Sequence, residues 1–414
     1  MKLDKFSARN LEDLYRSQLQ EIMDEWADHT EDTECGGYIT NFDENWNVTG
    51  TQKNIWAQAR QTYMFSVMYS YIDKNEKWLK LAKTGRDFLV SHAYAGEGRW
   101  YYELDRTGKK VLEGTTSIFT DLFVLSALSQ YAFASNDKSD LDLIEKTFLS
   151  AEKNVLDPYF KDIKPHKWKE GILRHSVYMI SVNAAGIAGN VRGRDKVLPF
   201  IKTCIDKILN FFNCNTSGFL LESIKEDGTI WDTDEGRLVN PGHIFEGMWF
   251  CIDEARVDNR ENEILDQVLK IIDITYKAAT DKINGGIIHR FDCFGRSDNR
   301  LLASTDQPNA DDKVDWVHCE SLYALALVAV LTKDQQRFKS FLELHDFCQK
   351  YFRPANGGDW YPLLSADGKV LKKHKGAKHR VAFHVPRALM KLTLLFRENA
   401  DQLVAATNNT DIGK

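Results

Sequence analysis

Apolar residues recur at steps of three and four through residues 8–30, which predicts an amphipathic helix there. The pattern then changes at Gly36-Gly37, where apolar and polar residues begin to alternate, and a turn follows at Glu44-Asn45. Alternation after a double glycine predicts a short β-hairpin. A helix followed by a glycine-opened hairpin is the first unit of a pattern that returns along the chain.

Similar glycine-opened segments start at positions 36, 98, 218, 285 and 357. Their separations are 62, 120, 67 and 72 residues, and the longest gap fits two periods with a degenerate copy near residues 157–160. An amphipathic helix precedes each segment, and a more apolar helix follows it. Six units of this kind at a roughly constant period are typical of a closed or stacked helical repeat.

The more apolar helix of each pair suits an inner ring that an outer ring covers. The predicted inner helices are residues 56–70, 117–132, 177–188, 243–255, 317–331 and 386–395. The predicted outer helices are residues 8–30, 78–89, 140–155, 197–212, 264–279 and 336–351. Twelve helices can form an open solenoid or a closed toroid. We predict the toroid: an all-α (α/α)6 barrel in a single domain, residues 1–414, with its short hairpins at one end around a central cavity and with residues 400–414 as a flexible tail.

Composition and charge restrict the partners more than the fold. The chain has 43% hydrophobic and 28% charged residues, a net charge of −6 and a pI near 6.0, so we expect no nucleic-acid partner. No apolar run approaches the roughly 20 residues of a membrane span, and the first residues lack the apolar core of a secretion signal. We therefore expect a cytoplasmic protein without a membrane partner. The seven scattered cysteines contain no CxxC pair and are expected to be reduced.

The fourth inner helix carries the most informative polar residues. Asn240 can cap a helix and Pro241 suits its first position, which places His243 in the first turn and Glu246 three residues later on the same side. The helix N-terminus disfavours the imidazolium, whereas a carboxylate favours it. A histidine under these opposing effects can titrate near neutral pH, as a general acid or base requires.

Polar residues in the first turns of the other inner helices would point into the same cavity. These candidates are Trp56 and Arg60 on the first helix, Asp121 on the second, His175 on the third, Trp249 on the fourth, Trp316 and Glu320 on the fifth, and His384 and Arg387 at the entry to the sixth. We expect His175 to cap or pack rather than react. His374 and His379 lie in a lysine-rich loop, and we expect them to be exposed to solvent.

Motifs for other chemistries are missing from the sequence. It contains no GxGxxG, GxxxxGK[ST] or GxSxG segment and no HExxH, so we expect neither a cofactor nor a metal. A glycoside hydrolase would need two facing acids, for which Asp121, Glu246 and Glu320 are available. The alternative is a pair of histidines, His243 and His384, which is suited to removing a proton from one face of a carbon and returning it to the other.

Four segments together resemble the N-acylglucosamine 2-epimerase superfamily. They are Trp56 to Arg60, Asn240 to His243 with Glu246 and Trp249, Trp316 with Glu320, and Phe383 to Arg387. The similarity runs from about Gly36 to Leu395 and is greatest to the N-acylglucosamine epimerase branch. The superfamily also contains cellobiose 2-epimerases, mannose 2-epimerases and aldose–ketose isomerases, and the fold that it implies is again an (α/α)6 barrel.

The resemblance implies roles for individual residues. His243 and His384 match the acid/base pair, Arg60 matches the arginine that contacts the substrate carbonyl oxygen, and Glu246 matches the carboxylate that orients His243. The predicted substrate-binding residues are Trp56, Trp249, Trp316, Glu320, Asp121 and Arg387. Two departures stand out, since Asp315 replaces the first residue of a frequent Trp-Trp pair, and the third inner helix lacks the His-x-His pattern of the disaccharide epimerases.

The activity that the resemblance implies is inversion of C2 of a reducing sugar, foremost N-acylglucosamine to N-acylmannosamine, through an enediol-like intermediate. An aldose–ketose isomerase and a mannose or cellobiose 2-epimerase are the nearest alternatives. An (α/α)6 glycoside hydrolase and a catalytically silent binding barrel are more distant ones. We expect a small monosaccharide or disaccharide as the partner, no cofactor and no metal, and a homodimer as the assembly to test.

Overall fold

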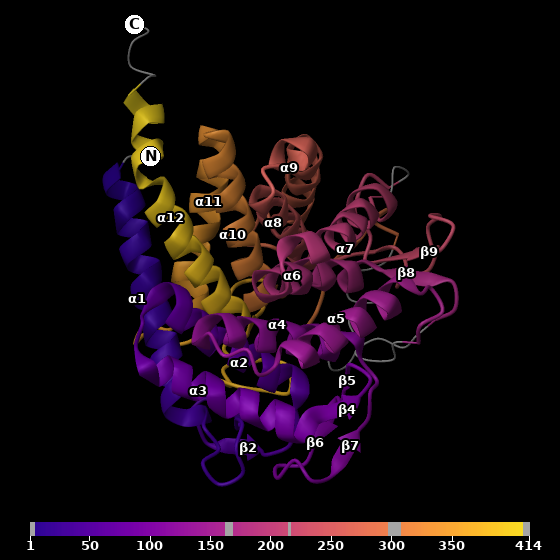
Figure 1. Cartoon of the computed structure of the whole chain (residues 1–414). Coiled ribbons are helices and arrows are strands. Elements are labelled where there is room, and N and C mark those ends of the chain that lie inside the picture. The colour runs from indigo at the N-terminus through magenta and orange to yellow at the C-terminus, as the bar shows by residue number, and fades with distance from the viewer. Residues whose placement is uncertain (1–4, 162–168, 214–216, 297–307, 409–414) are drawn as a thin grey trace, which may run out of the picture.

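The computed structural model describes residues 5–161, 169–213, 217–296 and 308–408. Twelve α-helices in this part of the chain alternate between an inner and an outer layer (Figure 1). The inner helices are α2 (Ile55–Val67), α4 (Ile118–Ser135), α6 (His175–Arg192), α8 (Pro241–Val257), α10 (Asp315–Thr332) and α12 (His384–Asn408). The outer helices are α1 (Lys5–Thr30), α3 (Glu76–Phe88), α5 (Leu141–Leu156), α7 (Arg194–Asp206), α9 (Glu261–Ala279) and α11 (Gln335–Phe347).

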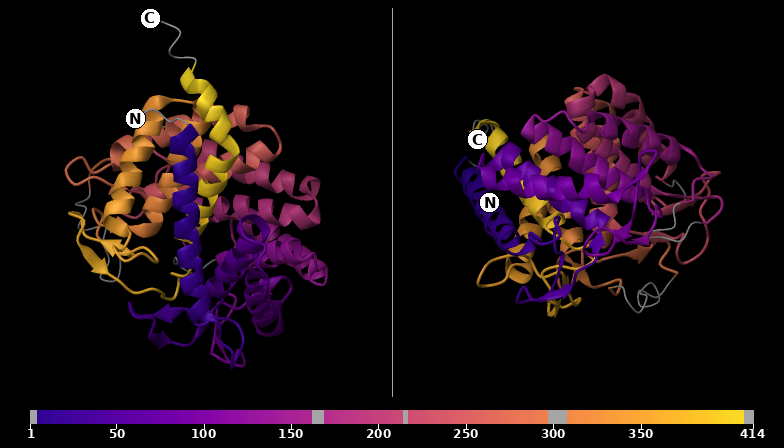
Figure 2. Two further views of the ribbon diagram at one scale, coloured as in Figure 1. Left: turned by 90° about the vertical axis from the view of Figure 1, so that its left-hand side faces the viewer. Right: turned by 60° about the horizontal axis from the view of Figure 1, so that its bottom comes forward.

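Contacts between the helices follow a ring. Each inner helix packs against the next one along the chain, from α2 through α4, α6, α8 and α10 to α12. The outer helices α3, α5, α7, α9 and α11 each pack on the inner helix of their own repeat, and α1 packs along α12. Both views in Figure 2 keep α1 and α12 side by side, so the first and last helices of the chain complete the last pair. The predicted (α/α)6 barrel is confirmed.

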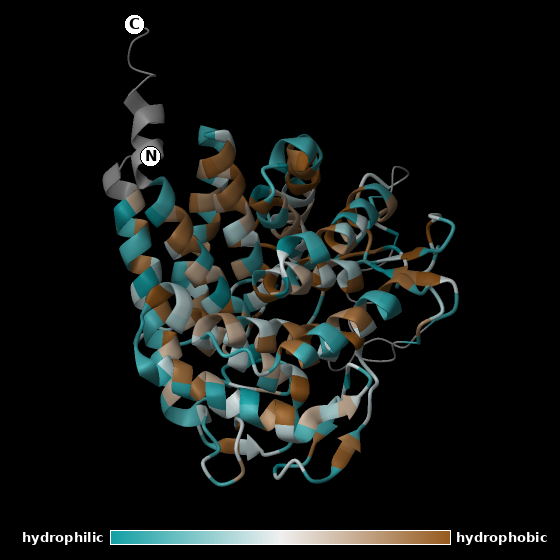
Figure 3. Ribbon diagram, viewed as in Figure 1, coloured by the Kyte–Doolittle hydropathy of each residue, from teal (hydrophilic) through white to brown (hydrophobic). Residues whose placement is uncertain are grey.

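Burial explains which helices became inner ones. All thirteen residues of α2 are buried, whereas α3 buries only five of its residues along one stripe. Figure 3 shows the same contrast, with teal and brown positions alternating along the outer helices. Four helices end in five-residue π-helical turns: η1 (Met68–Ile72) after α2, η2 (Leu89–Ala93) after α3, η3 (Lys207–Phe211) after α7 and η4 (Cys348–Phe352) after α11.

Two of the inner helices come closer to the length and hydropathy of a membrane span than expected. Helices α4 and α10 are each 18 residues long and apolar enough to cross a membrane by composition. In the barrel, 83% of each is buried inside the protein. Their apolar composition therefore matches their place in the inner ring, where neighbouring helices cover them on all sides.

Short strands join the ends of the helices. They are β1 (Asn41–Phe42), β2 (Val48–Gly50), β3 (Lys53–Asn54), β4 (Tyr94–Gly96), β5 (Arg99–Trp100), β6 (Glu103–Leu104), β7 (Val111–Glu113), β8 (Ile172–Arg174), β9 (Ser223–Lys225), β10 (Leu238–Val239), β11 (Phe291–Asp292), β12 (Lys313–Val314), β13 (Leu363–Leu364) and β14 (Val370–Lys372). The pairs β1–β2, β6–β7 and β13–β14 are the local antiparallel hairpins predicted after Gly36, Gly98 and Gly357. The pair β4–β5 is a further local hairpin, which was not predicted because β4 precedes Gly98.

Other strand pairs connect different repeats, which the hairpin prediction did not foresee. Strand β3 pairs with β6, β8 with β9, β10 with β11, and β12 with β13. In the last pair Lys313 lies opposite Leu364 and Val314 opposite Leu363. Each of these pairs places a segment that enters an inner helix beside a loop of a neighbouring repeat. The strands therefore fix the loops relative to one another at one end of the barrel.

Helix α12 extends into the segment that was predicted to be a tail. The backbone of residues 400–408 continues α12, and the remainder of the predicted tail lies outside the described residues. Five of the six described cysteines are buried, as predicted, and Cys35, Cys204, Cys251, Cys319 and Cys348 carry free thiols. Cys214 lies outside the described residues.

Candidate active site

A cavity of about 800 Å³ opens at the end of the barrel where the strands lie. First turns of the inner helices and the loops before them line it. The predicted site residues that the structure brings together on this cavity are Trp56, Arg60, His243, Glu246, Trp316 and His384. They come from four different inner helices, so only the closed ring places them together.

His243 lies in the first turn of α8, as predicted. The Asn240 side chain caps the helix by accepting a hydrogen bond from the backbone N–H of His243, and Pro241 occupies the first helical position. His243 Nδ1 lies 2.8 Å from Oε2 of Glu222. Since an ionised carboxylate only accepts hydrogen bonds, Nδ1 carries a proton and Nε2 is the nitrogen left for chemistry.

The expectation that Glu246 orients His243 is wrong. Glu246 is buried, and its Oε1 accepts a short hydrogen bond from Nη2 of Arg387. Glu222, from the loop directly before β9, holds the imidazole instead. Spacing along a single helix does not reveal Glu222, because this residue lies 21 positions before His243 and reaches it through the contact between two repeats. Its only signal in the sequence is an acid inside the segment that opens at Gly218.

His384 has a matching partner on another helix. It is the first residue of α12, and its Nδ1 lies 2.8 Å from Oε1 of Glu320 on α10. Glu320 is fully buried, and its Oε2 accepts a hydrogen bond of 2.9 Å from Nε1 of Trp249. The two histidines are therefore held in the same manner, each through Nδ1 by its own carboxylate, which leaves Nε2 free on each ring.

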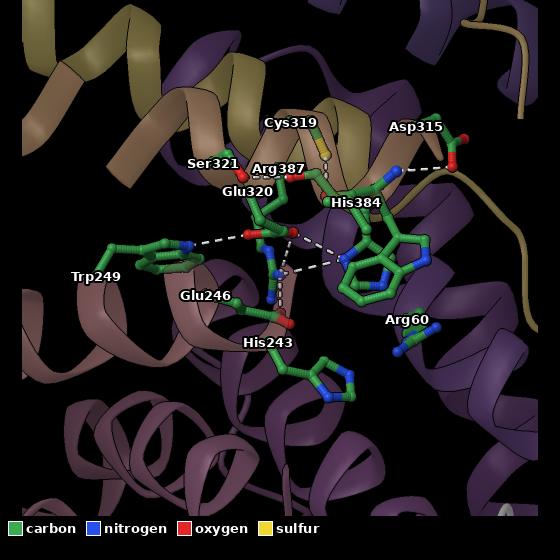
Figure 4. Close-up of polar contacts among 12 residues, drawn as sticks. Arg60, His243, Glu246, Trp249, Asp315, Cys319, Glu320, Ser321, His384 and Arg387 are labelled. Carbon is green, nitrogen blue, oxygen red and sulfur yellow. Dashed lines mark hydrogen bonds and ion pairs between the residues drawn. The ribbon is translucent and has the colours of Figure 1, made fainter. Parts of the chain in front are cut away.

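Arg387 joins the two helices behind His384. Its Nη2 donates to Glu246 and, at 2.7 Å, to Glu320, as Figure 4 shows. Arg387, Glu320 and Trp249 were predicted to bind substrate, but they lie behind the cavity lining and are almost completely buried. Helical spacing predicted the correct side of each helix. It could not predict how far behind the cavity lining each side chain lies, because that distance depends on how closely α8, α10 and α12 pack.

Asp121 is also not at the cavity. Its carboxylate accepts hydrogen bonds from Nε of Arg99 at 2.5 Å and from the backbone N–H of Trp100 at 2.9 Å, which ties β5 to the start of α4. With Asp121 and Glu320 both engaged behind the lining, the acid pair that a glycoside hydrolase would have used is not assembled at the cavity.

The ligand atoms of Glu246, Glu320 and His384 lie within 4.8 Å of one another, a spacing that could suit a metal ion. The Arg387 guanidinium already binds both carboxylates. This positive charge supplies the counter-ion that the two buried acids require. The three residues are therefore explained by an internal ion-pair network.

The surroundings of the two histidines move their pKa values in opposite directions. Burial alone would lower the pKa of His243, but the negative charge and hydrogen bond of Glu222 outweigh it and raise the pKa above the ordinary 6.5. Burial and then the positive charge of Arg60 hold the pKa of His384 well below 6.5. At a pH between the two pKa values the pair therefore consists of a protonated His243 and a neutral His384.

The Arg60 side chain lies among three aromatic rings where it reaches the cavity. Its guanidinium carbon lies 4.2 Å from the ring centre of Phe123, 4.6 Å from that of Phe383 and 5.2 Å from that of Trp56. Its Nη1 donates to the backbone carbonyl of His379 at 3.1 Å. Burial lowers the pKa of Arg60 to about 9, so the side chain stays charged at neutral pH. Arg60 forms no salt bridge with any described residue, and it places a positive charge beside His384.

Trp316 lies between the two histidines. The centre of its ring is 5.1 Å from that of His243 and 5.7 Å from that of His384. Gly242 makes this position possible, because a Cβ at residue 242 would meet Cζ3 of Trp316 at 2.4 Å. An aromatic surface beside both imidazoles is suited to one face of a sugar ring.

Three further histidines are partly or fully buried. His374 and His379 line the cavity and are half-buried, so the expectation of full solvent exposure is wrong. His379 lies 2.7 Å from the hydroxyl of Tyr102, and ion pairs of Arg380 draw the same loop inward. His175 is fully buried and packs against Phe212, as expected.

Comparison with known proteins gives one consistent picture. The model of the N-acylglucosamine 2-epimerase (GlcNAc 2-epimerase) family matches residues 36–388. The N-acylglucosamine 2-epimerase of Bos taurus is 24% identical over 403 residues, which cover 94% of this chain and 92% of that protein. Among solved structures, the cellobiose 2-epimerase of Spirochaeta thermophila superposes with a TM-score of 0.80 at 18% identity, covering 95% of this chain and 98% of that one. A D-mannose isomerase superposes with a TM-score of 0.79 at 20% identity, covering 92% and 97%.

Proposed function

This chain belongs to the N-acylglucosamine 2-epimerase family, and from that premise we propose that it inverts C2 of an N-acylglucosamine to give the N-acylmannosamine. The relatives carry the names of epimerases and isomerases that act on carbohydrates, so the chain is a carbohydrate epimerase or isomerase. Proteins named N-acylglucosamine 2-epimerase match it along 90% or more of its length, which supports the N-acylated sugar as substrate.

The observation that carries the proposal is the pair of opposite pKa shifts of two histidines on one cavity. His243 has its pKa raised by Glu222, and His384 has its pKa lowered by burial and Arg60. A reaction that takes a proton from one face of a carbon and delivers another to the opposite face needs one base and one acid at the start. The pair offers both before the substrate arrives.

The chemistry follows from these positions. The sugar opens to its aldehyde, and the Arg60 guanidinium binds the carbonyl oxygen O1. Neutral His384 removes the proton on C2 through Nε2, and Arg60 stabilises the negative charge that develops on O1 of the enediol-like intermediate. Protonated His243 then delivers its proton to the other face of C2, which inverts the centre. In the reverse direction the two histidines exchange roles.

The two carboxylates support this proton transfer from behind. Glu222 and Glu320 hold the imidazoles through Nδ1, so that each ring keeps one orientation while Nε2 gains or loses its proton. Trp316 and Trp56 line the cavity beside the histidines and would cover the sugar ring. No step of this sequence requires a redox cofactor.

A proton NMR time course on N-acetylglucosamine, N-acetylmannosamine, mannose, glucose and cellobiose tests the proposal. We expect the two N-acetylated epimers to interconvert and, in D₂O, the product to carry deuterium at C2. His384→Ala and His243→Asn should each reduce turnover by roughly a hundred- to ten-thousand-fold, the usual contribution of an acid or base. Release of a monosaccharide from cellobiose, or activity that survives both substitutions, would contradict the two-histidine mechanism.

An aldose–ketose isomerase is the second candidate, and the similarity to the D-mannose isomerase structure favours it. The same enediol-like intermediate can be protonated at C1 rather than C2, which needs one histidine only. A ketose product that still forms in the His243→Asn variant would support this alternative. Epimer formation that disappears in both histidine variants would support the epimerase.

A further inference from the structure

Arg290 is a cationic side chain on the cavity that has no carboxylate partner among the described residues. It precedes β11 and lines the same cavity as the two histidines. Within the described part of the chain its side chain makes one hydrogen bond, from Nη2 to the backbone carbonyl of Pro308 at 3.1 Å. Its Nε is buried and has no hydrogen-bond partner in the ranges that the structure describes. The guanidinium therefore keeps unused donors next to the cavity.

Two other arginines on the cavity are neutralised by acids, whereas Arg60 is the cation assigned above to the sugar carbonyl. Arg174 lies 2.9 Å from Glu235, and Arg380 lies 3.1 Å from Asp315. Burial lowers the pKa of Arg290, which means that its charged form bears a desolvation cost without an ion pair to offset it. A structural role would normally include a carboxylate. An acceptor supplied by the ligand explains the arrangement better.

The position of Arg290 is fixed rather than adaptable. The backbone N–H groups of His289 and Arg290 both donate to the carbonyl of Ala310, at 2.8 and 3.2 Å. The His289 ring is buried and lies 6.4 Å from the ring of Trp316, which itself lies beside His243. Arg290 thus belongs to the side of the cavity that adjoins the proton-transfer pair.

The charge of the cavity indicates a neutral acceptor. Five Arg and Lys side chains and five Asp and Glu side chains line it, so the lining has no excess of positive charge for an anionic sugar. An anionic substituent near C2 would also oppose formation of an enediol-like anion by charge repulsion. A carbonyl oxygen accepts hydrogen bonds from a guanidinium without adding charge.

We propose that Arg290 determines specificity by donating a hydrogen bond to the carbonyl oxygen of the acyl group on the C2 nitrogen. The inference rests on the proposed function, and it adds the residue that distinguishes N-acylated sugars from sugars with a free hydroxyl at C2. Arg290 takes no part in the proton transfer. Its removal should therefore affect recognition of the acyl group and leave the acid/base chemistry in place.

Arg290→Met and Arg290→Lys test this role in steady-state kinetics with N-acetylglucosamine and with mannose. For Arg290→Met we expect KM for N-acetylglucosamine to rise roughly ten- to a hundredfold, as for loss of a hydrogen bond to a charged group. The lysine variant should recover part of this loss, because it keeps the charge without the planar fork. Kinetics on mannose should not change. Arg260→Met is the matched control, since Arg260 pairs with Glu263 on the outer helix α9, away from the cavity.

Calorimetric binding to the His384→Ala protein gives an answer that does not depend on turnover. In that background Arg290→Met should weaken the binding of N-acetylglucosamine by the same factor. The binding of glucose should hardly change. The unfolding temperature of Arg290→Met should not fall, because the substitution removes a buried charge without an ion pair. A lowered unfolding temperature with equal losses for both sugars would assign Arg290 a structural role and overturn the inference.

Two further outcomes separate this inference from the proposed function. If the wild-type protein epimerises N-acetylglucosamine and Arg290→Met does so with unchanged KM, the function stands and the role of Arg290 is refuted. If the wild-type protein neither converts nor preferentially binds N-acetylated sugars, the proposed substrate and the acyl-recognition role both fall. Selective loss of N-acetylglucosamine binding in Arg290→Met supports both.

Discussion

His243 Nδ1 lies 2.8 Å from Oε2 of Glu222, and the two residues come from different segments of the ring. Glu222 stands at the entry to β9, whereas His243 lies in the first turn of α8. This contact raises the pKa of His243 against the effect of burial. The proton donor of the proposed reaction, His243 on α8, therefore depends on a carboxylate from a loop outside that helix.

Replacing Glu222 by Gln removes the negative charge that raises the pKa of His243. Because the carboxylate raises the pKa of His243, its loss should lower that pKa and move the alkaline limb of the pH–activity curve to lower pH. We expect kcat near neutral pH to fall by roughly a hundredfold, within the range of an acid/base contribution. Steady-state kinetics across pH measure both effects. Glu226→Gln, on the exposed turn that follows β9, is the control, and an unshifted alkaline limb in Glu222→Gln would refute the role.

The wild-type pH profile follows from the same two pKa shifts. Epimerisation in either direction needs a histidine pair that holds one proton. The rate should rise with pH as His384, whose pKa is lowered, loses its proton, and it should fall as His243, whose pKa is raised, loses the last one. We expect a plateau that extends on both sides of pH 6.5 and is the same for N-acetylglucosamine and N-acetylmannosamine. Measurements of kcat/KM in both directions check this, and a narrow maximum on either side of 6.5 would be inconsistent with it.

Arg387 is expected to control stability rather than substrate binding. Its guanidinium binds Glu246 and Glu320, and all three side chains are buried. Arg387→Met leaves two buried carboxylates without a counter-ion, which should cost about 3–5 kcal/mol of unfolding free energy. Denaturant unfolding at neutral pH measures the loss. Arg397→Met on the same helix removes a partly exposed pair with Glu12 and should cost less than about 1 kcal/mol. Equal losses in the two variants would show that the buried network contributes no more to stability than a partly exposed ion pair.

Most of the fold follows from periodicity, because an inner helix must be apolar on nearly all sides and an outer one on a single stripe. The helix start at Asn240-Pro241 and the cavity position of His243 follow from local capping, which involves only neighbours in the chain. The partners of the histidines do not. Glu222 reaches His243 from another repeat, and Glu320 lies behind His384 only because α10 and α12 pack closely.

Loop residues show the same limit of local reasoning. His379 lies in a lysine-rich segment that suggested exposure to solvent. In the structure, Arg380 pairs with Asp315 and Asp359, each at 3.1 Å, and draws the segment to the cavity, where the His379 carbonyl accepts a hydrogen bond from Arg60. These ion pairs span 65 and 21 positions of sequence. Composition of the loop alone could not reveal them.

Gly242→Ala tests the position of Trp316 between the two histidines. A helix normally gains about 1 kcal/mol when alanine replaces glycine, and Gly242 does not have a positive φ that would oppose the change. The added Cβ would meet Cζ3 of Trp316 at 2.4 Å, and this ring borders the cavity and can move into it. We expect kcat/KM to fall at least about tenfold while the unfolding temperature changes by no more than a few degrees, because a misplaced aromatic surface disturbs the substrate between the two bases. Kinetics and thermal unfolding of the same preparation measure both quantities. Trp316→Phe, with a smaller ring, combined with Gly242→Ala should recover part of the activity, and no recovery together with a large loss of stability would mean that Gly242 serves only the packing of α8.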